Sequence, residues 1–122
     1  MSKKKEALAR KVAREMATEA EKHADQAEVE KEATKTAYGE EKPMHADKAK
    51  KHANSAEDAA EVAKKAVDSV LNEGESVEGQ SKDVKEAKQA ATRAKHHSKR
   101  AKKAAEEAEK MVEEPPPESS KE

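Results

Sequence analysis

The chain has 122 residues and a net charge of −1, with 43% of its residues charged and 33% hydrophobic. Tyr38 is its only aromatic residue, Leu8 and Leu71 are its only leucines, and cysteine is absent. This composition excludes a conventional core of large apolar side chains, a buried small-molecule pocket and a thiolate metal site, and the balanced charge gives no overall attraction for nucleic acid.

The first predicted element is a helix over about residues 5–37, after a basic N-terminal tail of residues 1–4. Ala, Glu and Lys dominate it, and these residues are among the best helix formers. Its alanines keep a 3-4-3 spacing at positions 17, 20, 24 and 27. Lys31 and Thr34 then fall where alanine is expected. The register is therefore predicted to slip near residue 30, or the helix to fray there.

A second helix is predicted over about residues 44–72. Gly39 suits the end of the first helix and Pro43 suits the first turn of the second. The small apolar residues of this segment follow a 3-4-3-4 rhythm, which is a heptad repeat with apolar a and d positions. The predicted packing residues are Ala46, Ala49, Ala53, Ala56, Ala60, Ala63, Val67 and Val70.

A third helix is predicted over about residues 82–113. Gly74 and Gly79 mark the loop before it, and Ser81 is the expected N-cap. The same heptad rhythm runs through this segment, with Ser98 at one core position. The predicted packing residues are Val84, Ala87, Ala91, Ala94, Ala101, Ala105, Ala108 and Val112.

These elements predict an all-α fold, either an antiparallel three-helix bundle or a coiled coil. The helical domain spans residues 5–113, and residues 114–122, with three consecutive prolines, form a flexible C-terminal tail. Alanine also occupies several g positions, and an a/d/g face suits three helices better than two. The heptads do not determine whether the helices pair within one chain or between chains.

Charged residues at e positions are predicted to pair between the first and third helices. Glu21 and Glu28 lie on the first helix, and Lys88, Lys95 and Lys102 lie on the third. Such exposed pairs contribute well under about 1 kcal/mol each, so they select partners more than they stabilise.

Histidine is the only residue type with a candidate chemical role. The g positions include the candidate metal ligands His23, His45, His52 and His97. A solvated or half-buried role beside the core is the favoured interpretation. No catalytic constellation and no phosphate-binding loop stands out, so we expect neither an enzyme nor a cofactor. The basic cluster of residues 95–103 lacks aromatic residues and is interpreted as a solvated helix face rather than a nucleic-acid site.

Blocks of Ala-x-x-Ala-x-x-x heptads separated by short spacers resemble the alanine-heptad merozoite surface proteins of malaria parasites. The matching stretches are residues 46–67 and 87–108, with 17–27 as a weaker block. The resemblance implies an extracellular, non-enzymatic protein held at a cell surface by protein contacts and exposed to antibody. This chain lacks the signal peptide, glutamate-rich region and leucine zipper of that pattern, as an excised heptad domain would.

The favoured function is therefore a structural or protein-interaction module, a surface antigen domain that associates through its alanine heptads. No run of residues is apolar enough for a transmembrane helix. One alternative is a stress-protective protein resembling late embryogenesis abundant proteins, in the cytoplasm and disordered when hydrated. Another is a helical protein that binds haem or a metal through its histidines.

Overall fold

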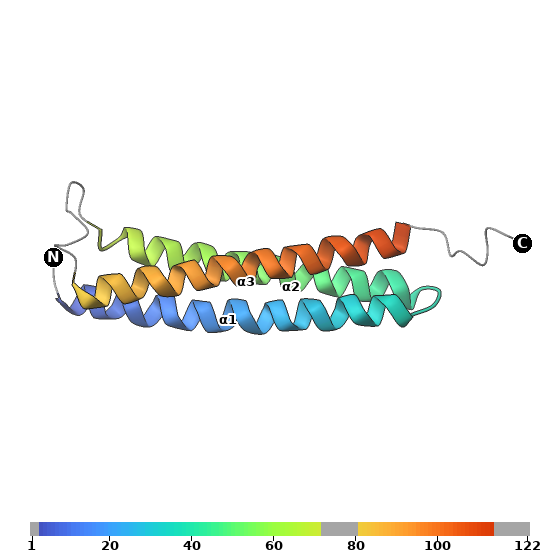
Figure 1. The fold of residues 1–122 in the computed structure, drawn as a ribbon, viewed down its shortest axis with the longest axis horizontal. Coiled ribbons are helices and arrows are strands. Elements are labelled where there is room, and N and C mark those ends of the chain that lie inside the picture. Colours follow the sequence, from blue (N-terminus) through green and yellow to red (C-terminus); the bar gives the residue numbers. More distant parts are fainter. Residues whose placement is uncertain (1–2, 72–80, 114–122) are drawn as a thin grey trace, which may run out of the picture.

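The computed structural model describes residues 3–71 and 81–113, which form three long helices lying side by side (Figure 1). Helix α1 spans Lys3–Thr36, α2 spans Glu41–Asp68 and α3 spans Lys82–Glu113. Helix α2 runs antiparallel to α1, and α3 runs back parallel to α1. The predicted all-α three-helix bundle is confirmed, and its helices pack within one chain.

The helix bounds differ from the predicted ones by more than one residue at three ends. Helix α1 begins at Lys3, so Lys3 and Lys4 belong to the helix rather than to a tail, because nothing in this Lys, Glu and Ala sequence opposes helix formation. Helix α2 begins at Glu41 and ends at Asp68, each a few residues earlier than predicted. Residues 1–2, 72–80 and the predicted tail 114–122 lie outside the described residues.

A tight turn at Gly39 reverses the chain between α1 and α2. Gly39 has a φ of 58°, in the left-handed region that favours glycine. The N–H groups of Glu41 and Lys42 donate to the carbonyl oxygens of Tyr38 and Gly39, both at 3.2 Å. These short-range bonds start α2 before Pro43, which therefore lies in the first turn of that helix.

The start of α3 is fixed by the expected cap. The backbone N–H of Val84 donates to Oγ of Ser81 at 3.2 Å, and Asp83 lies in the first turn. An oxygen acceptor and a negative charge both favour this end of a helix. The predicted N-cap at Ser81 is confirmed.

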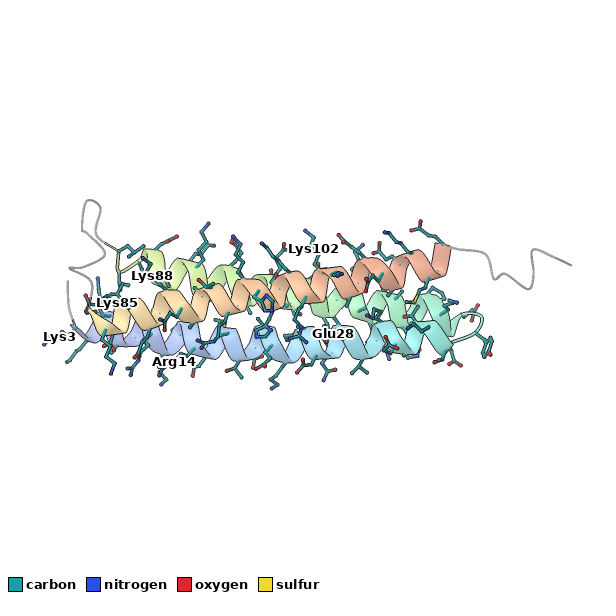
Figure 2. All side chains as sticks on the ribbon, viewed as in Figure 1. Lys3, Arg14, Glu28, Lys85, Lys88 and Lys102 are labelled. Carbon is teal, nitrogen blue, oxygen red and sulfur yellow. The ribbon has the colours of Figure 1, made fainter. Side chains whose placement is uncertain are left out.

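The core is a column of alanine methyl groups along the whole bundle, while the long polar side chains project outward (Figure 2). Of the 16 packing residues predicted for the second and third helices, 13 are buried, among them Val70 just after α2, but Ala60 and Ala91 are half-buried and Val112 is 36% exposed. The g-position residues Ala59, Ala90 and Ala104 are buried as well.

Val112 departs from the prediction, and it lies in the last turn of α3, at the end of the described part of the bundle. It lines only a shallow hollow that α2 forms with its Pro43 and Ala46. The positions of Ala60 and Ala91 have a different cause, a groove between α2 and α3 that is described below.

Helix α1 keeps its register through residue 30, and it neither slips nor frays there. Thr34 is completely buried at the expected core position, and its Oγ1 donates to the carbonyl oxygen of Glu30 at 2.7 Å. Lys31 is half-buried, and its Nζ reaches outward to Glu107 at 3.3 Å. Thr34 and Lys31 can therefore occupy core positions. The hydroxyl of Thr34 is hydrogen-bonded within its own helix, and the aliphatic part of the Lys31 side chain carries the ammonium group out to the surface.

Candidate functional site

The structure separates the four candidate histidine ligands into three places. His23 of α1 and His52 of α2 face each other, with their Nδ1 atoms 3.0 Å apart. Nδ1 of His45 lies 2.7 Å from Oε1 of Glu30. On α3, Nδ1 of His97 lies 2.8 Å from Nη1 of Arg100. The four rings therefore do not converge on one ion, and only His23 and His52 share a site.

Two of these histidines are held toward their neutral form. Burial is the main cause that lowers the pKa of His52, and the neighbouring His23 lowers it further, although Glu30 acts in the opposite direction. Burial likewise lowers the pKa of His97, and the charge of Arg100 adds to this effect. A neutral His97 can accept the hydrogen bond that Arg100 donates to it.

Ion pairs connect α1 to α3 along their length. Arg100 is the strongest of these connections: its Nε and Nη2 donate to both carboxylate oxygens of Glu28 at 3.0 and 2.8 Å, and Nη2 also donates to Asp25 at 2.7 Å. The bond from Arg100 lowers the pKa of Glu28. Near the other end of the seam, Arg10 lies 3.1 Å from Asp83.

The predicted pairing of e positions is only half right. Glu28 does pair across the α1–α3 seam, but its partner is Arg100 rather than Lys95 or Lys102. Those two lysines lie on the other side of α3, where it faces α2. The hand of the bundle determines which side of α3 faces α1 and which side faces α2. It therefore determines which cation of α3 can reach Glu28.

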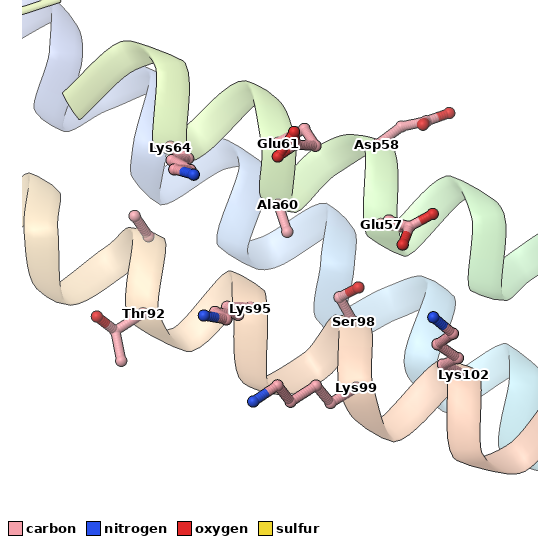
Figure 3. A pocket seen from close by; sticks show the side chains of 11 residues that line it. Glu57, Asp58, Ala60, Glu61, Lys64, Thr92, Lys95, Ser98, Lys99 and Lys102 are labelled. Carbon is pink, nitrogen blue, oxygen red and sulfur yellow. The ribbon is translucent and has the colours of Figure 1, made fainter. Parts of the chain in front are cut away.

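An open groove of about 800 Å³ runs between α2 and α3 (Figure 3), and we call it the α2–α3 groove. Its floor consists of small residues, which leave the two helices without a large side chain to fill the space between them. The residues that line it are Glu57, Asp58, Ala60, Glu61, Lys64, Ala91, Thr92, Lys95, Ser98, Lys99 and Lys102.

The two rims of the α2–α3 groove carry opposite charges. Glu57, Asp58 and Glu61 make the α2 rim mainly acidic, with Lys64 beyond them, and the α3 rim is basic. Among the described residues, no ion pair within 4.0 Å joins the α2 rim to the α3 rim. An ion pair between α2 and α3 joins Lys50 to Glu109 at 3.8 Å, and it lies beyond the groove. The rim charges are therefore available to a third element.

Other kinds of site are absent from the part of the chain that the structure describes. Residues 3–71 and 81–113 contain no cluster of three or more His, Cys, Asp or Glu residues that could hold a metal ion. Within the same ranges, no helix is long and apolar enough to cross a membrane. Comparison with protein-family models, curated proteins and solved structures finds no match to this chain.

Sequence reasoning missed both Arg100 and the groove. Arg100 belongs by sequence to the basic cluster 95–103, but the structure divides that cluster between two faces of α3. The signal for the groove was Ser98 at a core position, with Ala60 and Ala91 as its small neighbours. This signal is weak, because small residues also occupy the tightly packed core positions of this bundle.

Proposed function

We propose that this protein is a non-enzymatic interaction module whose α2–α3 groove binds an amphipathic helix of a partner protein. The observation that supports this proposal is the open groove itself, with its small floor residues and its oppositely charged rims. Amphipathic helices commonly bind by laying one face into a groove between two helices.

The floor of the groove sets how closely a helix can approach. Ala60, Ala91 and Ser98 have short side chains and are half-buried, so part of their surface remains open to solvent. A partner helix with alanine or other small residues along one face could pack against them at short interaxial distance, as the three helices of this bundle pack on each other.

The rims specify the charges of the partner. Lysines on one flank of the incoming helix would pair with Glu57 and Glu61, and glutamates on the other flank would pair with Lys95 and Lys102. The basic rim from Thr92 to Lys102 extends about 15 Å at 1.5 Å per residue, which is three turns of a helix. Exposed pairs of this kind contribute mainly to specificity and to the rate of association.

A designed helix provides the direct test. Its sequence has an alanine seam, lysines on one flank and glutamates on the other, and it carries a fluorophore for an anisotropy titration. We expect saturable binding to the native protein and at least about tenfold weaker binding to Glu57→Lys/Glu61→Lys, because two pairs become repulsive. A second peptide with glutamates on both flanks should prefer this variant, whose two rims are both basic.

The matched control is Glu15→Lys/Glu19→Lys on α1. It makes the same charge change at the same spacing on a helix that does not line the groove. This control should bind the first peptide as the native protein does. Equal loss in both variants, or binding that ignores the flanking charges, would refute the groove as the binding site. Sedimentation of the protein alone tests the other occupant, a second copy of this chain.

Display at a cell surface remains a proposal that rests on the resemblance to alanine-heptad surface proteins. We expect antibody raised against the folded bundle to label intact source cells without permeabilisation. Labelling only after permeabilisation would contradict surface display, and it would leave the proposed helix-binding role to be judged by the peptide titration.

A further inference from the structure

The α2–α3 groove lies on the face of α2 and α3 that points away from α1, which runs behind them in Figure 3. A helix bound in the groove would contact the same two helices as α1 does, but from the opposite side. The contacts of α1 therefore indicate how a bound helix would present its two flanks to this pair.

Each flank of α1 faces a different neighbour. Helix α1 runs parallel to α3. Its e position Glu28 bonds to Arg100 of α3, whereas its g position His23 contacts His52 of α2. Because protein helices are right-handed, a helix with the same direction on the opposite face presents its e positions to α2 and its g positions to α3. Reversing the direction of that helix exchanges the two flanks again.

The rim charges then link the direction of a bound helix to its sequence. The α2 rim is acidic at Glu57 and Glu61, and the α3 rim is basic at Lys95 and Lys102. To match these rims, a bound helix parallel to α2 needs glutamates at its e positions and lysines at its g positions. A bound helix parallel to α3 needs the opposite arrangement. The two sequences have the same composition, so the groove distinguishes them by the direction in which each can bind.

The two ends of the α2–α3 groove also differ in charge. At one end the rims carry Lys64 of α2 and Lys95 of α3 (Figure 3). At the other end the α2 rim carries Glu57 and Asp58, and the α3 rim carries Lys102. The C-terminus of a helix carries a partial negative charge and its N-terminus a partial positive charge. The end with two lysines therefore favours the C-terminus of a bound helix, and the end with two carboxylates favours its N-terminus.

We propose, building on the helix-binding role above, that the partner helix runs parallel to α2, with glutamates at its e positions against α3 and lysines at its g positions against α2. Its C-terminal end lies between Lys64 and Lys95. The groove thus selects a partner by the order of charges around its helix as well as by its apolar face.

Two peptides of identical composition, each with an alanine seam and a free C-terminal carboxylate, test this proposal. The matched peptide has glutamates at e and lysines at g, and the exchanged peptide has the reverse. We expect the matched peptide to bind about two- to fivefold more tightly in an anisotropy titration, the size of a surface helix-dipole interaction, because only its C-terminus meets the two lysines. Equal affinity for the two peptides would refute the preferred direction.

A nitroxide label at the C-terminus of each peptide measures the direction itself. With the matched peptide it should broaden the amide NMR signals of residues near Lys64 and Thr92. With the exchanged peptide it should broaden those near Glu57 and Lys102. Broadening of the same end by both peptides would overturn the proposal and leave the groove as the binding site. If neither peptide binds, the helix-binding role fails as well.

Lys64→Gln distinguishes the two peptides further. It should weaken the matched peptide, whose C-terminus lies beside Lys64, and should not weaken the exchanged peptide, whose N-terminus lies there. The matched control is Lys65→Gln, because Lys65 is its exposed neighbour on α2 and does not line the groove. This control should leave both affinities unchanged. Weakening of both peptides by Lys64→Gln would contradict the proposed direction.

Discussion

Individual polar residues hold the helices in register, and Arg100 contributes most to this. Its guanidinium donates to Glu28, to Asp25 and to His97, so one side chain of α3 fixes two turns of α1 and one turn of its own helix. Planar, bidentate bonding to a carboxylate gives geometric specificity that a lysine does not supply. In a core of methyl groups, which specify register poorly, such contacts matter more than usual.

Replacing Arg100 with alanine should therefore destabilise the bundle. We expect a loss of about 1 kcal/mol in the free energy of unfolding, because the bonds to Glu28 and Asp25 are lost in a partly solvated place. Arg93→Ala is the control, since Arg93 is exposed on the same helix and makes none of these contacts. Chemical denaturation measures both, and equal changes in the two variants would show that the contacts of Arg100 with α1 add no measurable stability.

At the scale of the helices, the three seams differ in how they are closed. Ion pairs run along the α1–α3 seam, and the α1–α2 seam contains the His23–His52 and Glu30–His45 contacts. The α2–α3 seam is open along the groove. Successive core alanines of one helix therefore have different environments: Ala56 is fully buried, whereas Ala60 one turn later lies on the groove floor.

Leucine substitutions at these two positions should have opposite consequences. Ala56→Leu inserts a large side chain into a closed seam and should cost about 1–3 kcal/mol of stability. Ala60→Leu has open space beside it, so its stability should stay unchanged or rise. Thermal unfolding followed by circular dichroism compares the two variants. A similar loss in both would mean that the groove is closed in solution.

At the scale of the whole molecule, stability is the sum of many small contributions. Each buried methyl group contributes about 0.8 kcal/mol, far less than a leucine side chain, while the helices gain from the high propensity of Ala, Glu and Lys. The intramolecular bundle already buries most heptad positions of the three helices, and the exceptions on α2 and α3 are Ala60, Ala91, Ser98 and Val112. Most of the core is therefore covered without a second copy.

We therefore expect the protein to be helical in dilute buffer and to unfold cooperatively at a midpoint that does not depend on protein concentration. Circular dichroism melts at several concentrations measure this directly. A midpoint that rises with concentration would indicate an oligomer. Low helicity that increases only on drying would instead support the stress-protective alternative.

Stability should also depend on pH, because the pKa values of His52 and His97 are lowered in the folded protein. The unfolded state, with a histidine pKa of about 6.5, binds protons more readily. Stability is therefore full above that pH and falls as the pH decreases from there through the lower folded-state values. A second loss follows at more acidic pH, as Glu28, whose pKa is also lowered, becomes protonated.

Denaturation midpoints measured across this range check the prediction. The double variant His52→Asn/His97→Asn should flatten the first decrease and keep the second. If stability still decreases near pH 6 by the same amount in the double variant, groups other than His52 and His97 cause that decrease.

The sequence alone was sufficient for three helices, for the buried face of each and for the Ser81 cap, because heptad spacing and capping are properties of neighbouring residues in the chain. The sequence pattern predicted an ion pair between Glu28 and a lysine such as Lys95, which the structure does not form. It also treated Lys31 and Thr34 as breaks in the heptad register. Both polar residues fit the register once the helix is built, since their side chains find partners that spacing does not reveal.

The tertiary structure decided what lies between the helices: the Arg100 contacts, the facing rings of His23 and His52, and the α2–α3 groove. The heptad periodicity determines which face of each helix is buried. The same periodicity fits a bundle of either hand, with the third helix on one side of the first pair or on the other. Only the hand of the bundle settles which side chains meet across each seam, and that hand depends on the packing of all three helices together.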